Sequence, residues 1–100
     1  MAKGYWIAHV DVFDMERYKK YIEANAAAFA KYGGKFLVRG GDSENPEGET
    51  RARHVVLEFE SFEQAKACYH SAEYQAAIPY RNKPDISVGD FVIVEGYDPA

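Results

Sequence analysis

The chain has 100 residues, enough for one domain and too few for a second hydrophobic core. Hydrophobic residues make up 47% of it and charged residues 28%, a balance typical of globular proteins that excludes wholesale disorder. The 12 basic and 16 acidic side chains give a net charge of −4. This charge is a poor match for the phosphate backbone of nucleic acid.

The only cysteine, Cys68, excludes an internal disulfide and any metal site built from several cysteines. No apolar run is long enough to cross a bilayer, and residues 1–4 lead into a strand pattern instead of a signal peptide. We therefore expect one domain over residues 1–100, located in the cytoplasm, with neither a membrane nor a nucleic acid as partner.

The first half of the chain predicts a strand and a long helix. Residues Tyr5–Val12 are rich in aromatic and β-branched side chains, as strands are. Asp14 is placed to cap a helix over Met15–Tyr32, and the glycine pair at 33–34 is placed to end it. Along this helix an apolar stripe recurs at helical spacing, formed by Tyr18, Ile22, Asn25 or Ala26, and Phe29.

Further elements follow at regular intervals. Ser61 opens a capping box with Gln64, and Ser71 is placed to start a short helix that Pro79 bends or ends. An acidic stretch over Asp42–Thr50 predicts an exposed loop. The remaining predicted strands are Lys35–Gly41, Arg53–Glu60 and Phe91–Tyr97.

The order strand, helix, strand, strand, helix, strand predicts an α+β fold of the ferredoxin-like kind. In this fold an antiparallel four-stranded sheet carries both helices on one face.

Alternation along the strands separates two faces of the predicted sheet. One face is apolar and is expected to lie under the helices: Trp6, Ala8, Val10, Val12, Phe36, Val38, Val55, Leu57, Phe59, Val92 and Val94. The other mixes apolar and ionisable residues: Tyr5, Ile7, His9, Asp11, Lys35, Leu37, Arg39, His54, Val56, Glu58, Phe91, Ile93 and Glu95. An exposed apolar patch of this size marks an interface, so we expect a homodimer in which two mixed faces meet.

Four segments along the chain carry a resemblance to a known family. They are YGGKFLVRGG at 32–41, Glu58-Phe59, YHSAEYQ at 69–75, and Glu95-Gly96-Tyr97. Together they resemble the DUF1330 family, which implies membership of the dimeric α/β-barrel superfamily and a face-to-face homodimer. The family has no established activity. Relatives in the superfamily include cofactor-independent monooxygenases, isomerases, dehydratases and haem-binding enzymes, and such activities do not transfer by fold alone.

The mixed face holds the candidate catalytic residues His9, Glu58 and Arg39. A histidine beside a carboxylate can act as a general base, and an arginine can hold a carboxylate or enolate oxygen. We place the first and third strands side by side and parallel. The expected neighbours are then His9 with Glu58, Tyr5 with His54, Arg39 with His54, and Lys35 with Glu58. The alternative, which we favour, is that these charges only pair with one another.

Candidate ligand-binding residues lie on the mixed face and around the break in the second helical segment. There they rim a pocket or pack on the core, and the sequence leaves both readings open. They are His54, Tyr5, Tyr69, Ser71, Tyr74 and Arg81.

Metal-ligating residue types occur on the mixed face without a short-range ligand motif. We therefore expect no metal and no cofactor. Cys68, next to Ala65 on the packed side of its helix, is expected to be a core thiol.

These observations predict a homodimer that binds a small organic acid or aromatic metabolite in a cavity beside the sheet. One alternative is a cofactor-independent isomerase, lyase or monooxygenase that uses the His9–Glu58 dyad. Another is a purely structural dimerisation module. Residue types do not separate the first two, because binding pockets and active sites use the same ones.

Overall fold

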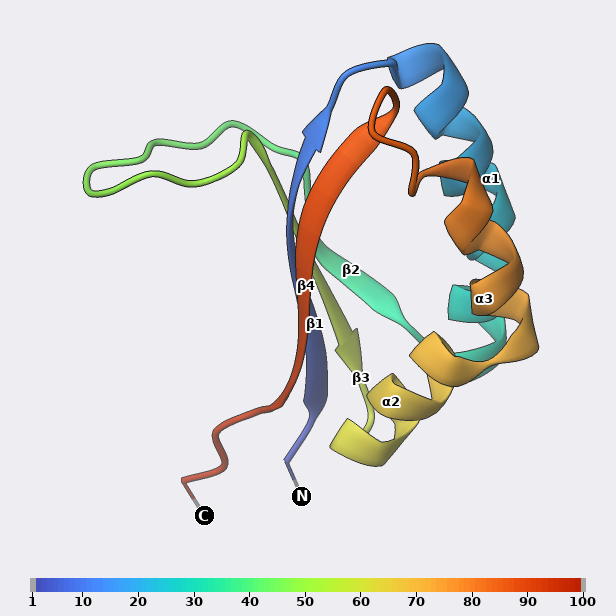
Figure 1. Ribbon diagram of the computed structural model, residues 1–100. Coiled ribbons are helices and arrows are strands. Elements are labelled where there is room, and N and C mark those ends of the chain that lie inside the picture. The colour runs from blue at the N-terminus through green and yellow to red at the C-terminus, as the bar shows by residue number, and fades with distance from the viewer. Residues whose placement is uncertain (1, 100) are drawn as a thin grey trace.

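A computed structural model describes residues 2–99 and shows a four-stranded antiparallel sheet with the helices on one face (Figure 1). The strand order is β2-β3-β1-β4. This is the predicted ferredoxin-like α+β fold. Its elements are β1 (Gly4–Val12), α1 (Met15–Tyr32), β2 (Lys35–Arg39), β3 (Arg53–Phe59), α2 (Phe62–His70), α3 (Ala72–Ala77), the 3-10 turn η1 (Ile78–Tyr80) and β4 (Ser87–Glu95).

Helix α1 has the predicted ends. The carboxylate of Asp14 accepts a hydrogen bond from the Arg17 backbone N–H at 3.2 Å, which satisfies one of the unpaired donors of the first turn. Gly33 adopts a left-handed conformation with φ 71° and donates its N–H to the Phe29 carbonyl. These local signals fix the length of α1 and therefore the side chains that it turns toward the sheet.

Serine side chains start the two later helices, as predicted. Ser61 accepts a hydrogen bond from the Gln64 backbone N–H at 3.0 Å, and Ser71 accepts one from that of Tyr74 at 3.1 Å. The predicted capping box is only half formed. The Gln64 side chain donates to the Tyr32 carbonyl at 3.3 Å and thereby ties α2 to the end of α1.

The core is built around Trp6 in β1, which is 2% exposed. Its ring contacts those of Phe29, Phe59 and Tyr74, with centroids 4.8 to 5.5 Å apart. Its indole Nε1 donates to the Ala65 carbonyl at 2.8 Å, so its polar group is satisfied in the interior.

No helix among residues 2–99 is long and apolar enough to span a membrane.

The predicted parallel pairing of the first and third strands is wrong. β1 and β3 are antiparallel, with Tyr5 opposite Glu58 and His9 opposite His54. The crossover through α1 makes β2 run in the direction of β1, and the turn after β2 reverses the chain. Strand β3, which lies between them, therefore opposes both.

The predicted faces of β4 are also wrong. The strand starts at Ser87, four residues earlier than predicted, and pairs Ala8 with Phe91 and Trp6 with Ile93. Residues directly opposite in an antiparallel pair share a face. Phe91 and Ile93 therefore pack toward the helices, and Val92 and Val94 face away.

A register shift in β2 moves two further side chains. Phe36 lies opposite Leu57 but Val38 lies opposite Val56, so one extra residue is accommodated between them. As a result Val38 turns to the open face, where it is 42% exposed. Arg39, opposite Val55, turns to the helix side, so its predicted place on the mixed face across from His54 is wrong.

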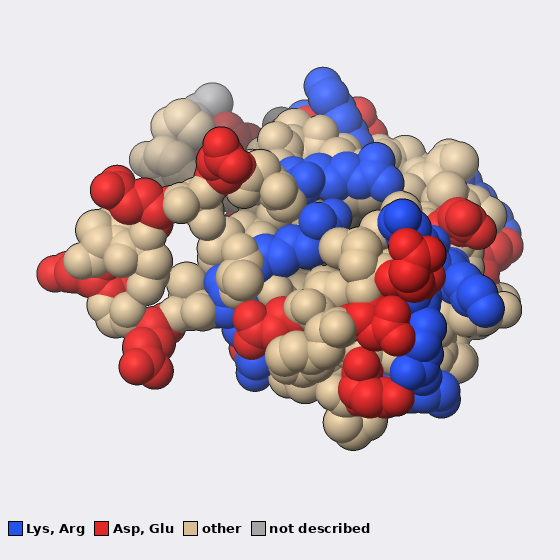
Figure 2. All heavy atoms as spheres, turned by 90° about the horizontal axis from the view of Figure 1, so that it is seen from above, with Lys and Arg blue, Asp and Glu red and all other residues tan. Residues whose placement is uncertain are grey.

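The connection from β2 to β3 is the exposed acidic loop that the sequence predicts. It projects away from the helices, beyond the other face of the sheet (Figure 1). Figure 2 shows acidic side chains spread along the loop, whereas the adjoining body carries basic and acidic side chains together.

Candidate functional site

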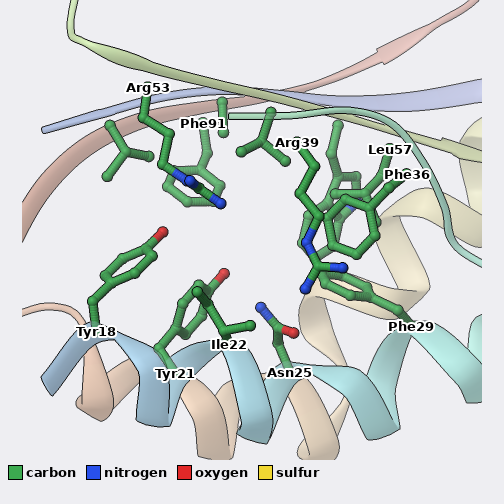
Figure 3. Close-up of a pocket in the computed structure, with 14 residues that line it drawn as sticks. Tyr18, Tyr21, Ile22, Asn25, Phe29, Phe36, Arg39, Arg53, Leu57 and Phe91 are labelled. Atoms are coloured by element: carbon green, nitrogen blue, oxygen red, sulfur yellow. The ribbon is translucent and has the colours of Figure 1, made fainter. Parts of the chain in front are cut away.

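A hollow lies between α1 and the helix-facing side of the sheet (Figure 3). Its cavity volume is about 30 Å³. Much of its wall is aromatic, and the polar atoms at the wall come from a few side chains. A concave apolar site with few polar groups is typical of small-molecule binding.

Two arginines enter the hollow from the sheet side (Figure 3). Arg39 lies opposite Val55, and Arg53 precedes Val55 by two residues on the same face, so the arginines are diagonal neighbours on adjacent strands. Among the residues that the structure describes, neither forms an ion pair, and the lining of the hollow contains no Asp or Glu. The site therefore concentrates positive charge without an internal counter-charge.

Arg53 is held close to the backbone of the neighbouring strand. A Cβ on Gly40 would overlap its Nη1 atom, and Gly40 has the positive φ of 68° that favours glycine. The Nε of Arg53 is buried and has no hydrogen-bond partner within residues 2–99. A buried donor without a partner costs free energy.

Helix α1 supplies the opposite wall. The hydroxyl of Tyr18 points into the hollow (Figure 3), and the residue is 3% exposed. Burial raises its pKa to about 12, and the nearby charges of Arg53 and Arg81 oppose this shift in part. Tyr18 is therefore a neutral phenol at physiological pH and can donate a hydrogen bond.

Asn25 places an amide in the same wall. It is 5% exposed, and no residue in the described part of the chain hydrogen-bonds to its side chain. The sequence left a choice between Asn25 and Ala26 at this position of the predicted apolar stripe. The structure buries Asn25 and exposes Ala26.

A hydroxyl network supports the hollow from behind. The Tyr21 and Tyr74 hydroxyls are 2.6 Å apart, and Arg81 donates to the Tyr74 oxygen at 3.2 Å. The Arg81 guanidinium also lies over the rings of Tyr21 and Phe91, at 5.2 and 4.4 Å from their centroids. Tyr74, a candidate ligand residue, is fully buried in the core and does not line the hollow; its ring packs against Trp6, which does.

The other candidates around the helix break serve the fold. Ser71 caps α3 and donates its hydroxyl to the Cys68 carbonyl at 2.6 Å, and the Tyr69 ring packs on Trp6. Cys68 is fully buried, as predicted, and burial raises the pKa of its thiol to about 12.

On the open face, the predicted pairings of His9 with Glu58 and of Tyr5 with His54 are wrong. The Nδ1 atoms of His9 and His54 are 2.8 Å apart, so one imidazole donates to the other. Tyr5 donates its hydroxyl to the Glu58 carboxylate at 2.9 Å. The predicted pairing of Lys35 with Glu58 is confirmed. The proposed roles of these residues in chemistry stay predictions.

Two acidic side chains near His9 share one basic partner. Arg51 bridges the carboxylates of Asp11 and Asp90, at 3.0 and 2.8 Å. Within residues 2–99 no group of three metal-ligating side chains comes together.

Sequence reasoning missed Arg53, Tyr18, Tyr21 and Asn25 as site residues. Alternation in β3 could have identified Arg53. It is separated from Val55 and Leu57 by an even number of positions along the strand, so it lies on the same apolar face as they do. An arginine on the face that helices cover needs an opening or an anion beside it.

We expect Tyr18 to make stability depend on alkaline pH. Its pKa is raised above the unfolded value near 10, so its contribution is complete below pH 10 and is lost as the pH rises toward 12. The free energy of unfolding of wild type relative to Tyr18→Phe should fall by about 1.4 kcal/mol per pH unit in that range. Urea unfolding at pH 9, 10 and 11 measures this difference, and parallel curves for the two proteins would contradict it.

Comparisons with known proteins agree with this fold. A protein of unknown function from Rhodopseudomonas palustris superposes with a TM-score of 0.74 at 15% identity, covering 98% of this chain and 85% of that one. An ethyl tert-butyl ether d (ethd) family protein from Bacillus halodurans C-125 gives 0.51 at 13% identity, covering 92% and 97%. A dimeric ferredoxin-like protein of unknown function from Thermobifida fusca YX gives 0.50 at 15% identity, covering 94% and 89%.

At these identities the likeness shows the fold alone, and no curated protein matches the chain. The family model described as Domain of unknown function (DUF1330) matches residues 3–97. Because this match spans nearly the whole sequence, the chain belongs to the DUF1330 family.

Proposed function

We propose that this protein binds a small organic acid with an apolar body in the hollow between α1 and the sheet. The observation that carries the proposal is the pair of guanidiniums, Arg39 and Arg53, facing an aromatic cavity whose described lining holds no carboxylate. A guanidinium recognises a carboxylate through two parallel hydrogen bonds. The aromatic rings would hold the apolar body.

The energetics favour an anion over a neutral ligand. Hydrogen bonds that involve a charged group contribute about 1.5–3 kcal/mol each, and the hollow shields them partly from water. The neutral Tyr18 phenol and the Asn25 amide add donors on the helix side. Such a site discriminates by charge first and by the shape of the apolar body second.

Arg39 has to move for a ligand larger than a few water molecules to enter. Its side chain is exposed, and its guanidinium lies over the Phe36 ring at 4.2 Å from the centroid. An exposed cation–π contact contributes about 0.5–1 kcal/mol, which one carboxylate contact would offset. We expect Arg39 to swing from Phe36 onto the ligand.

Benzoate and benzamide, which share their shape, test the charge requirement. We expect benzoate to bind at least tenfold more tightly than benzamide, and Arg53→Gln to weaken benzoate binding by tenfold or more because a charged hydrogen bond is lost. Titration followed by ¹H–¹⁵N NMR measures both and locates the shifted residues.

Lys20→Gln is the matched control, because Lys20 is exposed on α1 and does not line the hollow. It removes the same charge and should leave the benzoate affinity unchanged. Equal binding of benzamide, or an equal loss in Lys20→Gln, would contradict the proposal.

We further propose that two copies pair through the open face of the sheet, as the sequence predicts. Its apolar side chains remain uncovered in the single chain, with Val92 51% and Val94 40% exposed. A contiguous exposed apolar patch is typical of an interface. The T. fusca neighbour is itself described as dimeric. The face comprises Tyr5, Ile7, His9, Val38, His54, Val56, Glu58, Val92 and Val94.

A buried ammonium should separate the two copies. We expect wild type to sediment as a dimer at micromolar concentration and Val92→Lys to sediment as a monomer, because the lysine would be buried without a partner. Ala27→Lys, on the exposed side of α1, should stay dimeric. Monomeric wild type, or a dimeric Val92→Lys, would contradict the pairing.

A further inference from the structure

We infer that the ligand of the hollow is an organic diacid, with one carboxylate for Arg39 and a second for Arg53 at the two ends of an apolar body. The inference rests on the proposed function above and makes it narrower.

The two guanidiniums have separate supports. Arg39 stacks on Phe36, whereas Arg53 lies beside Gly40 and near the Tyr18 hydroxyl. Figure 3 shows them on opposite sides of the hollow, both directed from the sheet toward α1. Each therefore presents its own fork of donors, and each fork matches one carboxylate.

Charge balance favours two negative groups. Two like charges that share one partly shielded hollow repel each other. A single carboxylate would neutralise one guanidinium and leave the other unpaired. Arg81, which stacks on Tyr21 and Phe91 behind the wall, adds a third positive charge nearby. A dianion compensates both arginines of the hollow at once.

The wall between the arginines suits the body of such a ligand. On the helix side Ile22 and Asn25 lie between Tyr18, near Arg53, and Phe29, near Arg39 (Figure 3). Ile22 offers apolar contact, and the unpartnered Asn25 amide offers one neutral hydrogen bond. A spacer of carbon atoms fits this middle region better than a polyhydroxylated one, because the wall supplies few other polar atoms.

The test compares each diacid with its own monomethyl ester, which keeps the shape and removes one charge. The probes are terephthalate, which is rigid, and adipate, which is flexible, titrated calorimetrically at pH 7.5 where free carboxyl groups are ionised. We expect at least one diacid to bind at least fivefold more tightly than its monoester. That ratio should fall at least threefold in Arg39→Gln and stay within threefold of wild type in Lys20→Gln.

The outcomes separate the two claims. Monoesters that bind within fivefold of both diacids would overturn the diacid inference and leave the organic-acid function standing. A ratio that survives in Arg39→Gln, or inorganic phosphate that binds as tightly as the better diacid, would also overturn it. The absence of binding by every acid, benzoate included, would remove the proposed function as well.

Discussion

Strand register decides which side chains meet on each face of this sheet, and one extra residue in β2 changes that register partway along the strand. Before the shift, Phe36 points to the helices opposite Leu57. After it, Arg39 points the same way opposite Val55, where plain alternation would have turned it outward. The hollow has its second guanidinium only because of this local irregularity. Bulges of this kind often redirect a side chain next to a functional site.

The redirected arginine lies in an unusual electrostatic setting. Elsewhere in the described chain, basic side chains form ion pairs at the surface. Examples are Lys31 with Glu73 and Arg17 with Asp85. Arg39 and Arg53 share a concave, largely aromatic space, and the acidic residues of the chain lie elsewhere, many on the projecting loop (Figure 2). Moving a charged group out of water costs free energy, and packing against the neighbouring side chains offsets only part of that cost. Under the proposed function, a carboxylate from outside would complete the site.

Local signals in the sequence were sufficient for the elements and the fold. Asp14, Ser61 and Ser71 cap helices where their side-chain chemistry places them, and the order of elements led to the observed sheet. Pairing depends on long-range geometry, which local alternation does not contain. For that reason the predicted parallel pairing, which placed His9 beside Glu58, is wrong. Phe91 and Arg39 were assigned to the wrong face for the same reason.

The site itself could be predicted only in part. The sequence predicts a cavity beside the sheet from the mixed face, and the organic-acid ligand stays a prediction. The residues that line the hollow depend on the strand register. The place of Arg53 could be predicted from strand alternation alone, because it shares the face of Val55 and Leu57. Arg39 was not, because the sequence KFLVR shows no sign of where an extra residue would be accommodated.

The central claim is that the hollow under the sheet, with its unpaired guanidiniums, is an anion site. Crystals grown with 4-bromobenzoate test it most directly, because anomalous scattering locates the bromine without ambiguity. We predict a bromine peak between α1 and the sheet, with the carboxylate within hydrogen-bond distance of Arg53. Bromine found only on the open face or at the surface, with the hollow closed by its own side chains, would contradict it.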